Sequence, residues 1–461
     1  MKKLIITLFI LFIFGCTTEA PVVENIEVLA VENKKKPEEK MIGVARSYED
    51  EAQTIKENKI IDQPKKIITN TNGPQYEVAR DKDINFDLNV LEIKEITMPA
   101  SITYGPDGRL YVGQLDGSIV AFTQPSLGSI SPEYIVGPGT FEQILGLAFN
   151  QNEPSGLITL YVSHSRLHTK TEDPPFQGKI SKIEEPEFDP ETVISGLPVQ
   201  TGDHANNGIA FDQKGRLFIA QGGSTNAGLP IAPLDRDETP LSGAILVADL
   251  SDPNFDGEIK YNTERATHQT NKISGDVKVF ASGFRNPFDL VIHSNGKIYS
   301  TDNGPSKYFR GESISCFEDS SMGVDGPDEL NLVEEGYYYG HPNRNRGRFN
   351  KDECTYYSGD SSSKEIMQPI ALLGNFLSAN GIGEYYSDVF DGKMIGDLVY
   401  VDFKNGEVWR VELSSDGQRV EAISSLYEKV ATGAVDLALT PDGAIYVTHV
   451  GGAIYYLSPM K

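Results

Sequence analysis

The chain has 461 residues, with 41 Lys and Arg against 66 Asp and Glu, a net charge of −25 and a pI of about 4.7. Charge-driven binding to nucleic acid or to anionic lipid needs clustered Lys and Arg, so this balance argues against both. A hydrophobic content of 39%, with 44 Gly and 26 Pro, excludes a wholly disordered chain and a multi-span membrane protein, and it favours a turn-rich β protein.

The first sixteen residues, 1–16, are predicted to be an export signal. Lys2 and Lys3 precede the apolar run 4–15, which is shorter than the roughly 20 residues that a membrane-spanning helix needs. The run ends at Gly15-Cys16, which resembles a bacterial lipobox, where the Cys thiol is acylated. This pattern predicts an outer-membrane lipoprotein, periplasmic or surface-facing, that contacts the membrane only through lipid on Cys16. The alternative is an ordinary signal peptide with an incidental Cys.

Residues 17–75 are predicted to be a flexible tether, because charged residues crowd them and they contain neither Trp nor Phe. With so little aromatic surface to bury, we expect most of the segment to stay extended. The folded domain is therefore expected at residues 76–461.

The cysteine count adds one covalent possibility. If Cys16 carries lipid, Cys316 and Cys354 remain of the three Cys in the chain. A disulfide between them is plausible in an oxidising compartment. The alternative is two free thiols.

A hairpin unit recurs through the folded domain. Each copy has an apolar strand, a turn with Gly seven residues after the start, and then Leu or Ile followed by an aromatic residue. The turn Gly supplies the positive φ that a tight hairpin demands. The four copies occupy residues 101–112, 208–219, 289–300 and 436–447, with a longer-turned copy at 146–163 and another hairpin at 404–410. Such repetition predicts an all-β fold, a β-propeller of six four-stranded blades.

Four polar clusters interrupt the repeat at its loops. Equivalent loops of successive blades converge on one face of a propeller, so these clusters are predicted to share one cleft. The clusters are residues 202–208, residues 283–287, residues 302–305 with 328–331, and residues 403–406.

Taken together and in this order, the clusters resemble those of the soluble PQQ-dependent glucose dehydrogenases, also called glucose/sorbosone or aldose sugar dehydrogenases. The resemblance covers residues 95–458 and is strongest across 203–342. It implies a six-bladed propeller that oxidises the C1 hydroxyl of an aldose to the lactone. It also implies PQQ and Ca²⁺ as cofactors, a small sugar as substrate and an external electron acceptor.

The resemblance assigns catalytic roles to three residues. His204 stands where the family has its general base, a role that suits a side chain with a pKa near neutrality. Asp203 matches a residue that orders the site, and Arg285 matches one that stabilises developing negative charge. The alternatives are a structural histidine at His204 and a structural ion pair at Arg285.

The resemblance also implies a cofactor site and two calcium sites. Ca²⁺ accepts main-chain carbonyl oxygens as ligands, and such carbonyls are expected to hold the ion beside the quinone. The expected cofactor contacts are Arg285, Asn286, Asn303, Asp328 and Lys404, with Gly304 and Pro305 at the first calcium ion and Glu329 and Tyr339 at the second. For Lys404 the alternative is a solvent-facing turn, and for Asp328-Glu329 it is a solvated strand end.

The chain departs from the family before its last repeat. Two arginines of the family would fall at Gly433 and Val435, and only Asp436 of that motif is retained. The Trp of a family Tyr-Gly-Trp-Pro run is replaced by His341. PQQ is a tricarboxylate, so the loss of two cations is expected to weaken its binding. Two alternative functions stay open: a PQQ-free propeller that binds glycan or protein at the outer membrane, and a Ca²⁺-dependent hydrolase of lactones.

Overall fold

The computed structural model describes the chain from residue 83 to residue 460 with several gaps. Asp203, the three Cys and the segment 17–75 lie outside the described residues, so the predictions for them stay predictions. The described ranges are 83–153, 156–200, 204–228, 230, 234–267, 269–306, 326–342, 366–375 and 377–460, together with three two-residue strands.

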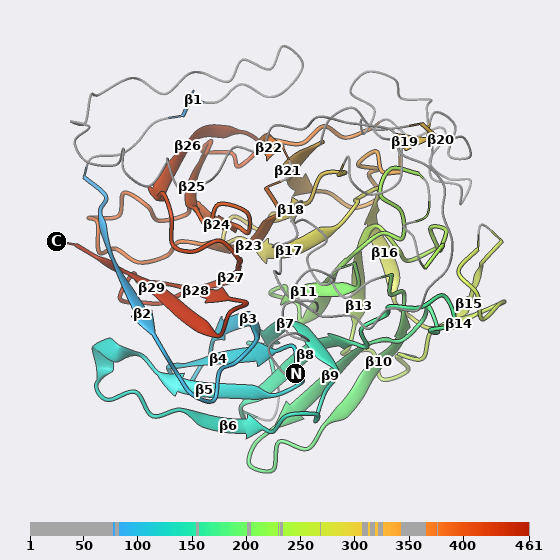
Figure 1. The fold of residues 1–461 in the computed structure, drawn as a ribbon, viewed down its shortest axis with the longest axis horizontal. Coiled ribbons are helices and arrows are strands. Elements are labelled where there is room, and N and C mark those ends of the chain that lie inside the picture. The colour runs from blue at the N-terminus through green and yellow to red at the C-terminus, as the bar shows by residue number, and fades with distance from the viewer. Residues whose placement is uncertain are drawn as a thin grey trace, which may run out of the picture. The chain divides into compact units, whose positions relative to one another are not determined.

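Six sheets, each with four antiparallel strands and one of them extended by a short parallel strand, are arranged as blades around a central axis (Figure 1). The predicted all-β propeller with six blades is therefore confirmed. Among the residues that the structure describes, no helix is long and apolar enough to cross a membrane.

The first three blades follow the chain order. Blade 1 is β3 (Pro99–Tyr104), β4 (Arg109–Gln114), β5 (Ile119–Thr123) and β6 (Glu133–Val136); blade 2 is β7 (Gln143–Phe149), β8 (Thr159–Ser165), β9 (Gly178–Glu184) and β10 (Glu191–Leu197); blade 3 is β11 (Asn206–Phe211), β12 (Arg216–Gln221), β13 (Ala244–Asp249) and β16 (Lys278–Ser282). A 3₁₀ turn, η2 (Pro125–Leu127), precedes β6, and the pair β14 (Lys260–Tyr261) and β15 (Lys272–Ser274) precedes β16.

The remaining blades contain two additions, the small pair β19 (Glu312–Ser313) with β20 (Asp319–Ser320), and β1 (Glu77–Val78), which pairs with β26 (Val420–Tyr427). Blade 4 is β17 (Pro287–Ile292), β18 (Ile298–Asp302), β21 (Pro327–Val333) and β22 (Ala371–Asn375); blade 5 is β23 (Ala379–Glu384), β24 (Leu398–Asp402), β25 (Val408–Leu413) and β26 (Val420–Tyr427); blade 6 is β27 (Ala434–Leu439), β28 (Ile445–His449), β29 (Ala453–Pro459) and β2 (Phe86–Leu91).

The repeated hairpins of the sequence form the inner two strands of their blades. The four copies with short turns become β3–β4, β11–β12, β17–β18 and β27–β28, and the longer copy becomes β7–β8. Their turn glycines have the positive φ expected, for example 81° at Gly108 and 84° at Gly443. The inner strands β3, β7, β11, β17, β23 and β27 contact one another in a closed ring. Residues that precede these strands therefore meet near one end of the axis.

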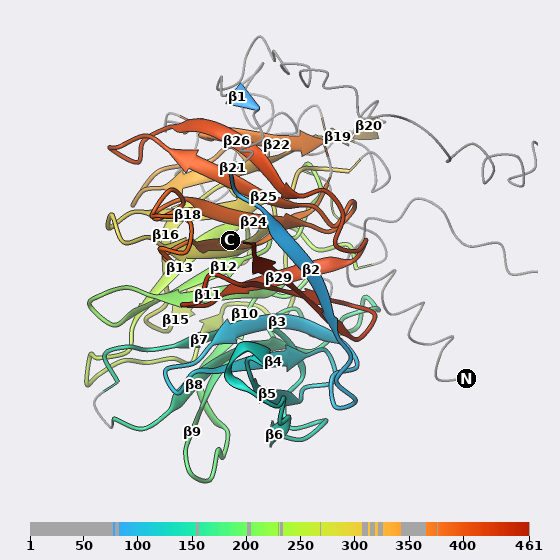
Figure 2. The same cartoon turned by 90° about the vertical axis from the view of Figure 1, so that its left-hand side faces the viewer.

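The ring is closed by strands from both ends of the domain. β2 adds to the outer edge of blade 6 by pairing antiparallel with β29, from Phe86 opposite Pro459 to Leu91 opposite Ile454 (Figure 2). The blades are held together by apolar layers between adjacent sheets; one of them joins Phe86 of β2 to Val399 of blade 5. Such burial of aliphatic and aromatic side chains is the main source of stability in a propeller.

Candidate active site

The predicted site residues come together where inner strands of blades 3, 4 and 5 begin. His204 lies just before β11, and Arg285-Asn286 lies just before β17. Asn303 follows β18 and donates from Nδ2 to the carbonyl of Ala379, the first residue of β23, at 2.9 Å. Three blades therefore contribute to one polar cluster.

His204 is buried, and its ring is fixed in one orientation. Its Nδ1 lies 2.9 Å from the Gly223 carbonyl oxygen, so Nδ1 carries the proton and donates. Within the described residues no hydrogen bond reaches Nε2, which leaves its lone pair available. Burial first, and the nearby Arg285 charge second, lower the pKa of His204 to about 3. This value is below the near-neutral one expected for the family base, and it keeps the imidazole neutral at physiological pH.

Arg285 is buried against the side chain and backbone of Asn226. Nη2 donates to Asn226 Oδ1 at 2.9 Å, and Nε donates to the Asn226 carbonyl at 3.1 Å. The backbone N–H groups of Arg285 and Asn286 donate to the Asp302 carboxylate, at 2.8 Å for Asn286. Asn226 was not singled out in the sequence, although it holds the guanidinium in place.

Side-chain amides link Asn286 to its neighbours. Asn286 Nδ2 donates to Asn303 Oδ1 at 3.1 Å, and Asn286 Oδ1 accepts from Asn207 Nδ2 at 3.0 Å. All three amides are buried. Asn207 lies in the first polar cluster of the sequence, yet its role depends on β17, about 80 residues later. A network of this kind fixes the direction of each donor and acceptor before any ligand binds.

The expected calcium loop brings several main-chain oxygens together. A Cβ on Gly304 would lie 2.4 Å from the Gly326 carbonyl oxygen and 2.5 Å from that of Pro327, so only Gly fits there. The Pro305 carbonyl accepts from Gly326 N–H at 2.7 Å. Carbonyl oxygens are suitable ligands for Ca²⁺, so the donor chemistry of this loop suits the ion, and calcium binding by Gly304 and Pro305 stays a prediction.

Asp328 fixes this loop through its backbone contacts. Its Oδ1 accepts from Gly304 N–H at 2.7 Å, and its Oδ2 accepts from Leu377 and Ala379 N–H at 3.0 and 2.9 Å. Both carboxylate oxygens are thus used to join β21 to the first calcium loop and to blade 5. The geometry favours support of the loop over direct contact with a cofactor.

The second expected calcium site is less defined. Glu329 is buried and accepts from Asn331 Nδ2 at 3.4 Å. The Tyr339 hydroxyl donates to the Leu332 carbonyl, and its ring stacks on Phe284 with centroids 4.4 Å apart. In the described part of the chain no three His, Cys, Asp or Glu side chains form a metal-binding group. The assignment of Glu329 and the Tyr339 carbonyl stays a prediction.

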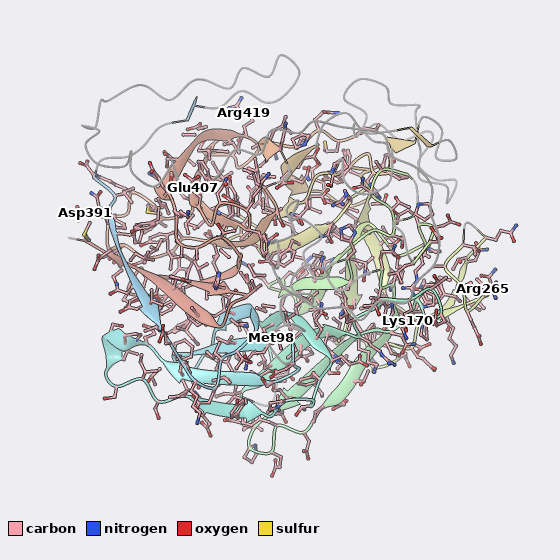
Figure 3. The ribbon with its side chains drawn as sticks, viewed as in Figure 1. Met98, Lys170, Arg265, Asp391, Glu407 and Arg419 are labelled. Atoms are coloured by element: carbon pink, nitrogen blue, oxygen red, sulfur yellow. The ribbon has the colours of Figure 1, made fainter. Side chains whose placement is uncertain are left out.

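An apolar layer occupies the positions of the missing arginines. Val435 is fully buried and packs with Phe403 and Phe288, while Met98, which Figure 3 labels, packs against the same layer. Lys404, the next residue after Phe403, is exposed, and its backbone N–H donates to the Leu377 carbonyl at 3.1 Å. The described site thus offers a buried cation at Arg285 and an exposed one at Lys404. This set fits an anionic cofactor, with fewer cations than the family pattern has.

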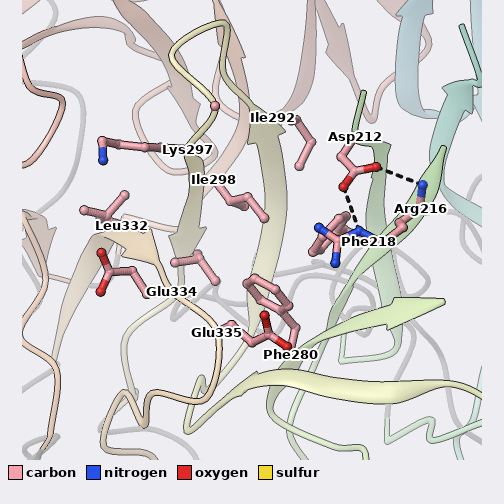
Figure 4. Close-up of a pocket in the computed structure, with 12 residues that line it drawn as sticks. Asp212, Arg216, Phe218, Phe280, Ile292, Lys297, Ile298, Leu332, Glu334 and Glu335 are labelled. Carbon is pink, nitrogen blue, oxygen red and sulfur yellow. Dashed lines mark hydrogen bonds and ion pairs between the residues drawn. The ribbon is translucent and has the colours of Figure 1, made fainter. Parts of the chain in front are cut away.

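The groove drawn in Figure 4 is separate from this polar cluster. It has a volume of about 280 Å³ and lies at the other end of the inner strands, where Arg216 pairs with Asp212 at 2.8 Å. Phe280 and Glu335 line the same groove. No residue of the predicted site lines it.

The fold and the site together define a class of protein: a six-bladed propeller with a polar site of His, Arg and Asn where the inner strands begin. The chain belongs to the glucose/sorbosone dehydrogenase family, whose model matches residues 96–455. The family expected from the motifs is therefore confirmed.

Two curated relatives and one solved structure illustrate the similarity. The chain is 23% identical over 285 residues to quinoprotein glucose dehydrogenase B of Acinetobacter calcoaceticus, which covers 58% of this chain and 54% of that protein. It is 24% identical over 289 residues to aldose sugar dehydrogenase YliI of Escherichia coli K12, a match that covers 58% of this chain and 64% of that protein. The matches thus span about half to two thirds of these relatives.

The fold also matches that of the PQQ-bound aldose sugar dehydrogenase of Streptomyces coelicolor, with a TM-score of 0.54, 16% identity and coverage of 81% of this chain and 99% of that one. At this identity the likeness concerns the fold.

Proposed function

We propose that this chain is a lipid-anchored extracytoplasmic sugar dehydrogenase that oxidises the C1 hydroxyl of an aldose to the lactone. The observation that carries the proposal is the orientation of His204: Nδ1 is held by the Gly223 carbonyl, and Nε2 is left as an acceptor. Family membership supports the reaction type. The anchor on Cys16 rests on the sequence alone.

In this reaction His204 Nε2 accepts the proton of the C1 hydroxyl. A pKa of about 3 makes His204 a weak base in the resting site. The hydroxyl becomes strongly acidic as hydride leaves C1, because the product would otherwise be a protonated lactone, so a weak, well-placed base is sufficient. Arg285 places a fixed positive charge beside the reacting atoms, where burial makes it most effective. Asp203 keeps its expected role of ordering the site.

PQQ, when bound, supplies the quinone that takes up the hydride, and electrons then leave to an external acceptor. Arg285, Asn286, Asn303 and Lys404 would hold it, and the Gly304 and Pro305 carbonyls would hold Ca²⁺. The buried amides of Asn286 and Asn303 are already linked at 3.1 Å, which favours a preformed site.

The test is dye reduction by the purified protein with PQQ, Ca²⁺, a panel of aldoses and an artificial electron acceptor. We expect reduction that requires all of these components and is lost in His204→Gln. The matched control is His293→Gln, because His293 is also buried, also contacts a backbone carbonyl, that of Gly396 at 2.8 Å, and lies at the other end of β17. An absence of dye reduction together with an absence of PQQ binding by calorimetry would overturn the proposal.

A second candidate function is a PQQ-free propeller that binds glycan or protein. It is favoured by the apolar layer around Val435, which lacks cations for a tricarboxylate. Glycan binding that persists in His204→Ala, in a protein that binds no PQQ, would support this candidate over the dehydrogenase.

A further inference from the structure

A carboxylate and a histidine form a buried pair beside His204. His341 Nε2 lies 2.7 Å from Glu238 Oε1, and both side chains are 2% exposed. Glu238 lies in the connection between β12 and β13, and His341 follows β21, so the pair joins blades 3 and 4. Burying a charge without partners is strongly unfavourable, so such a pair needs a structural or functional reason.

The Glu238 carboxylate is satisfied by a dense set of donors. Oε2 accepts from Ser224 N–H at 2.9 Å and Ser242 Oγ–H at 2.6 Å. Oε1 accepts from Thr225 N–H at 2.9 Å and Thr225 Oγ–H at 2.7 Å, in addition to His341. Burial alone would raise the pKa of Glu238, but His341 and these donors lower it to about 2. Glu238 is therefore ionised and fixes the backbone at Ser224 and Thr225.

The backbone that Glu238 fixes contacts the candidate active site at both of its ends. At one end, the Gly223 carbonyl accepts the His204 Nδ1–H at 2.9 Å. At the other, Asn226 Oδ1 accepts from Arg285 Nη2 at 2.9 Å and from Ser306 N–H, one residue after the calcium loop, at 3.0 Å. Four consecutive residues, 223–226, thus connect the base, the buried cation and the calcium loop.

The pair packs directly on this segment because Gly223 has no side chain. A Cβ there would lie 2.8 Å from the Arg285 carbonyl oxygen and 3.1 Å from both Glu238 Oε1 and His341 Nε2. A larger residue would push the pair away from the backbone. The Ser224 N–H that donates to Glu238 belongs to the same planar peptide group as the Gly223 carbonyl, so a shift of Glu238 also moves that carbonyl.

We propose that Glu238, with His341 as its partner, is the positioning residue that orients His204 and Arg285 through residues 223–226. The inference rests on the proposed function only for what His204 does once it is oriented. No sequence motif marked Glu238, and the sequence marked His341 only as a departure from the family pattern.

The first test substitutes Glu238→Gln, which keeps the shape of the side chain. An amide has one acceptor oxygen, so its NH₂ group must face a donor such as Ser224 N–H. In ¹⁵N-histidine NMR of the full chain, with His204→Gln assigning the signal, we expect wild-type His204 to be neutral and protonated on Nδ1. In Glu238→Gln we expect His204 to give the signals of a mixture of forms in place of the single form protonated on Nδ1. We also expect kcat to fall at least tenfold while KM changes less than threefold.

A second pair of variants separates positioning from general stability. His341→Gln retains a donor toward Glu238, and His341→Leu does not, so we expect the first to keep the wild-type His204 signal and the second to lose it. The matched control is Asp397→Asn, which removes the charge of the partly buried Asp397–Arg410 ion pair (2.6 Å). This pair lies just before β24, whereas Phe403 of the apolar layer follows the other end of that strand. We expect Asp397→Asn to lower Tm without changing the His204 signal.

A wild-type His204 signal in folded Glu238→Gln would overturn the positioning role. If Glu238→Gln does not fold, the two His341 variants decide, and identical His204 signals in both would overturn the role as well. If the wild-type protein oxidises no sugar, the proposed function fails, but the NMR comparison still tests the positioning role by itself.

Discussion

Two acidic side chains face an internal cavity on the propeller axis and predict an unusual pH dependence of stability. Asp289 of β17 and Asp436 of β27 line a cavity of about 140 Å³ between the inner strands. Each joins its blade to the next, because Asp436 Oδ2 accepts from Ile102 N–H at 2.8 Å and Asp289 Oδ2 from Ile382 N–H at 3.1 Å. Burial raises the pKa of both carboxyls, to about 6 for Asp436, and the Asp436 charge raises that of Asp289 further.

The sign of the effect follows from the direction of these shifts. A carboxyl whose pKa is higher in the folded state binds its proton more tightly there, so its contribution to stability is complete below its unfolded pKa of 3.8 and is lost as the pH rises through about 6. The rise in the pKa of Asp436 from 3.8 to about 6 corresponds to roughly 3 kcal/mol, of which about 1.4 kcal/mol is lost between pH 5 and pH 8. For a domain of this size that is about 2 °C in Tm.

The assay is calorimetric unfolding of the wild type and Asp436→Asn at pH 5 and pH 8. The amide cannot ionise, and loss of the Asp436 charge also lowers the pKa of Asp289, so we expect the fall in Tm between the two pH values to shrink by at least about 2 °C in the variant. The lost acceptor lowers Tm at both pH values and does not affect this difference. Substitution of the exposed Asp391, labelled in Figure 3, with Asn serves as the control and should leave the difference unchanged. Equal falls in the wild type and Asp436→Asn would refute the reasoning.

Three further outcomes follow from the candidate site. His204→Gln should lower kcat by about 10²–10⁴, and a wild-type rate in this variant would contradict the base role. Because the pKa of His204 is low, we also expect that wild-type activity does not fall through protonation of this residue between pH 7 and pH 5. Lys404 is exposed, so Lys404→Ala should leave Tm unchanged and weaken PQQ binding about fivefold, which is equivalent to about 1 kcal/mol and measurable by calorimetry. An unaltered affinity would show that Lys404 does not contact the cofactor. Asp328→Asn should lower the free energy of unfolding in urea by about 1–3 kcal/mol, because an amide cannot accept all three backbone N–H groups. The same variant should bind Ca²⁺ more weakly. A stability equal to wild type would contradict the role of Asp328 in anchoring the loop.

The blades could be predicted from the sequence because each hairpin is encoded locally. A turn Gly with positive φ, placed between alternating apolar residues, specifies its hairpin within about twelve residues. The closure of the ring could not be predicted in this way. Residues 86–91 pair with β29, more than 360 residues later, and no local pattern in them indicates this partner. The inner hairpin of blade 5 was also missed as a repeat, since residues 385–397 separate its two strands.

The site was predictable only where a motif marked it. His204, Arg285, Asn286 and Asn303 do meet, as the ordered clusters indicated. The groups that hold them were missed, because a buried carboxylate such as Glu238 is recognised by its donors, and those donors are brought together by folding alone. Asn226 is a similar case: its sequence surroundings resemble an ordinary polar loop, and its contact with Arg285 spans 59 residues.

The residues at positions 433 and 435, where the family has arginines, are fixed by the packing and by the backbone conformation. From the sequence, Gly433 and Val435 stand where the family has two arginines. In the structure neither position suits an arginine, because Val435 packs with Phe403 and Phe288, and Gly433 has a φ of 102° that disfavours any side chain. An arginine at position 435 would be surrounded by apolar groups, and burial of an unpaired cation is strongly unfavourable. We therefore expect an arginine introduced at position 435 to destabilise the fold and not to improve PQQ binding. A gain in PQQ affinity would require the surrounding apolar residues to be changed as well.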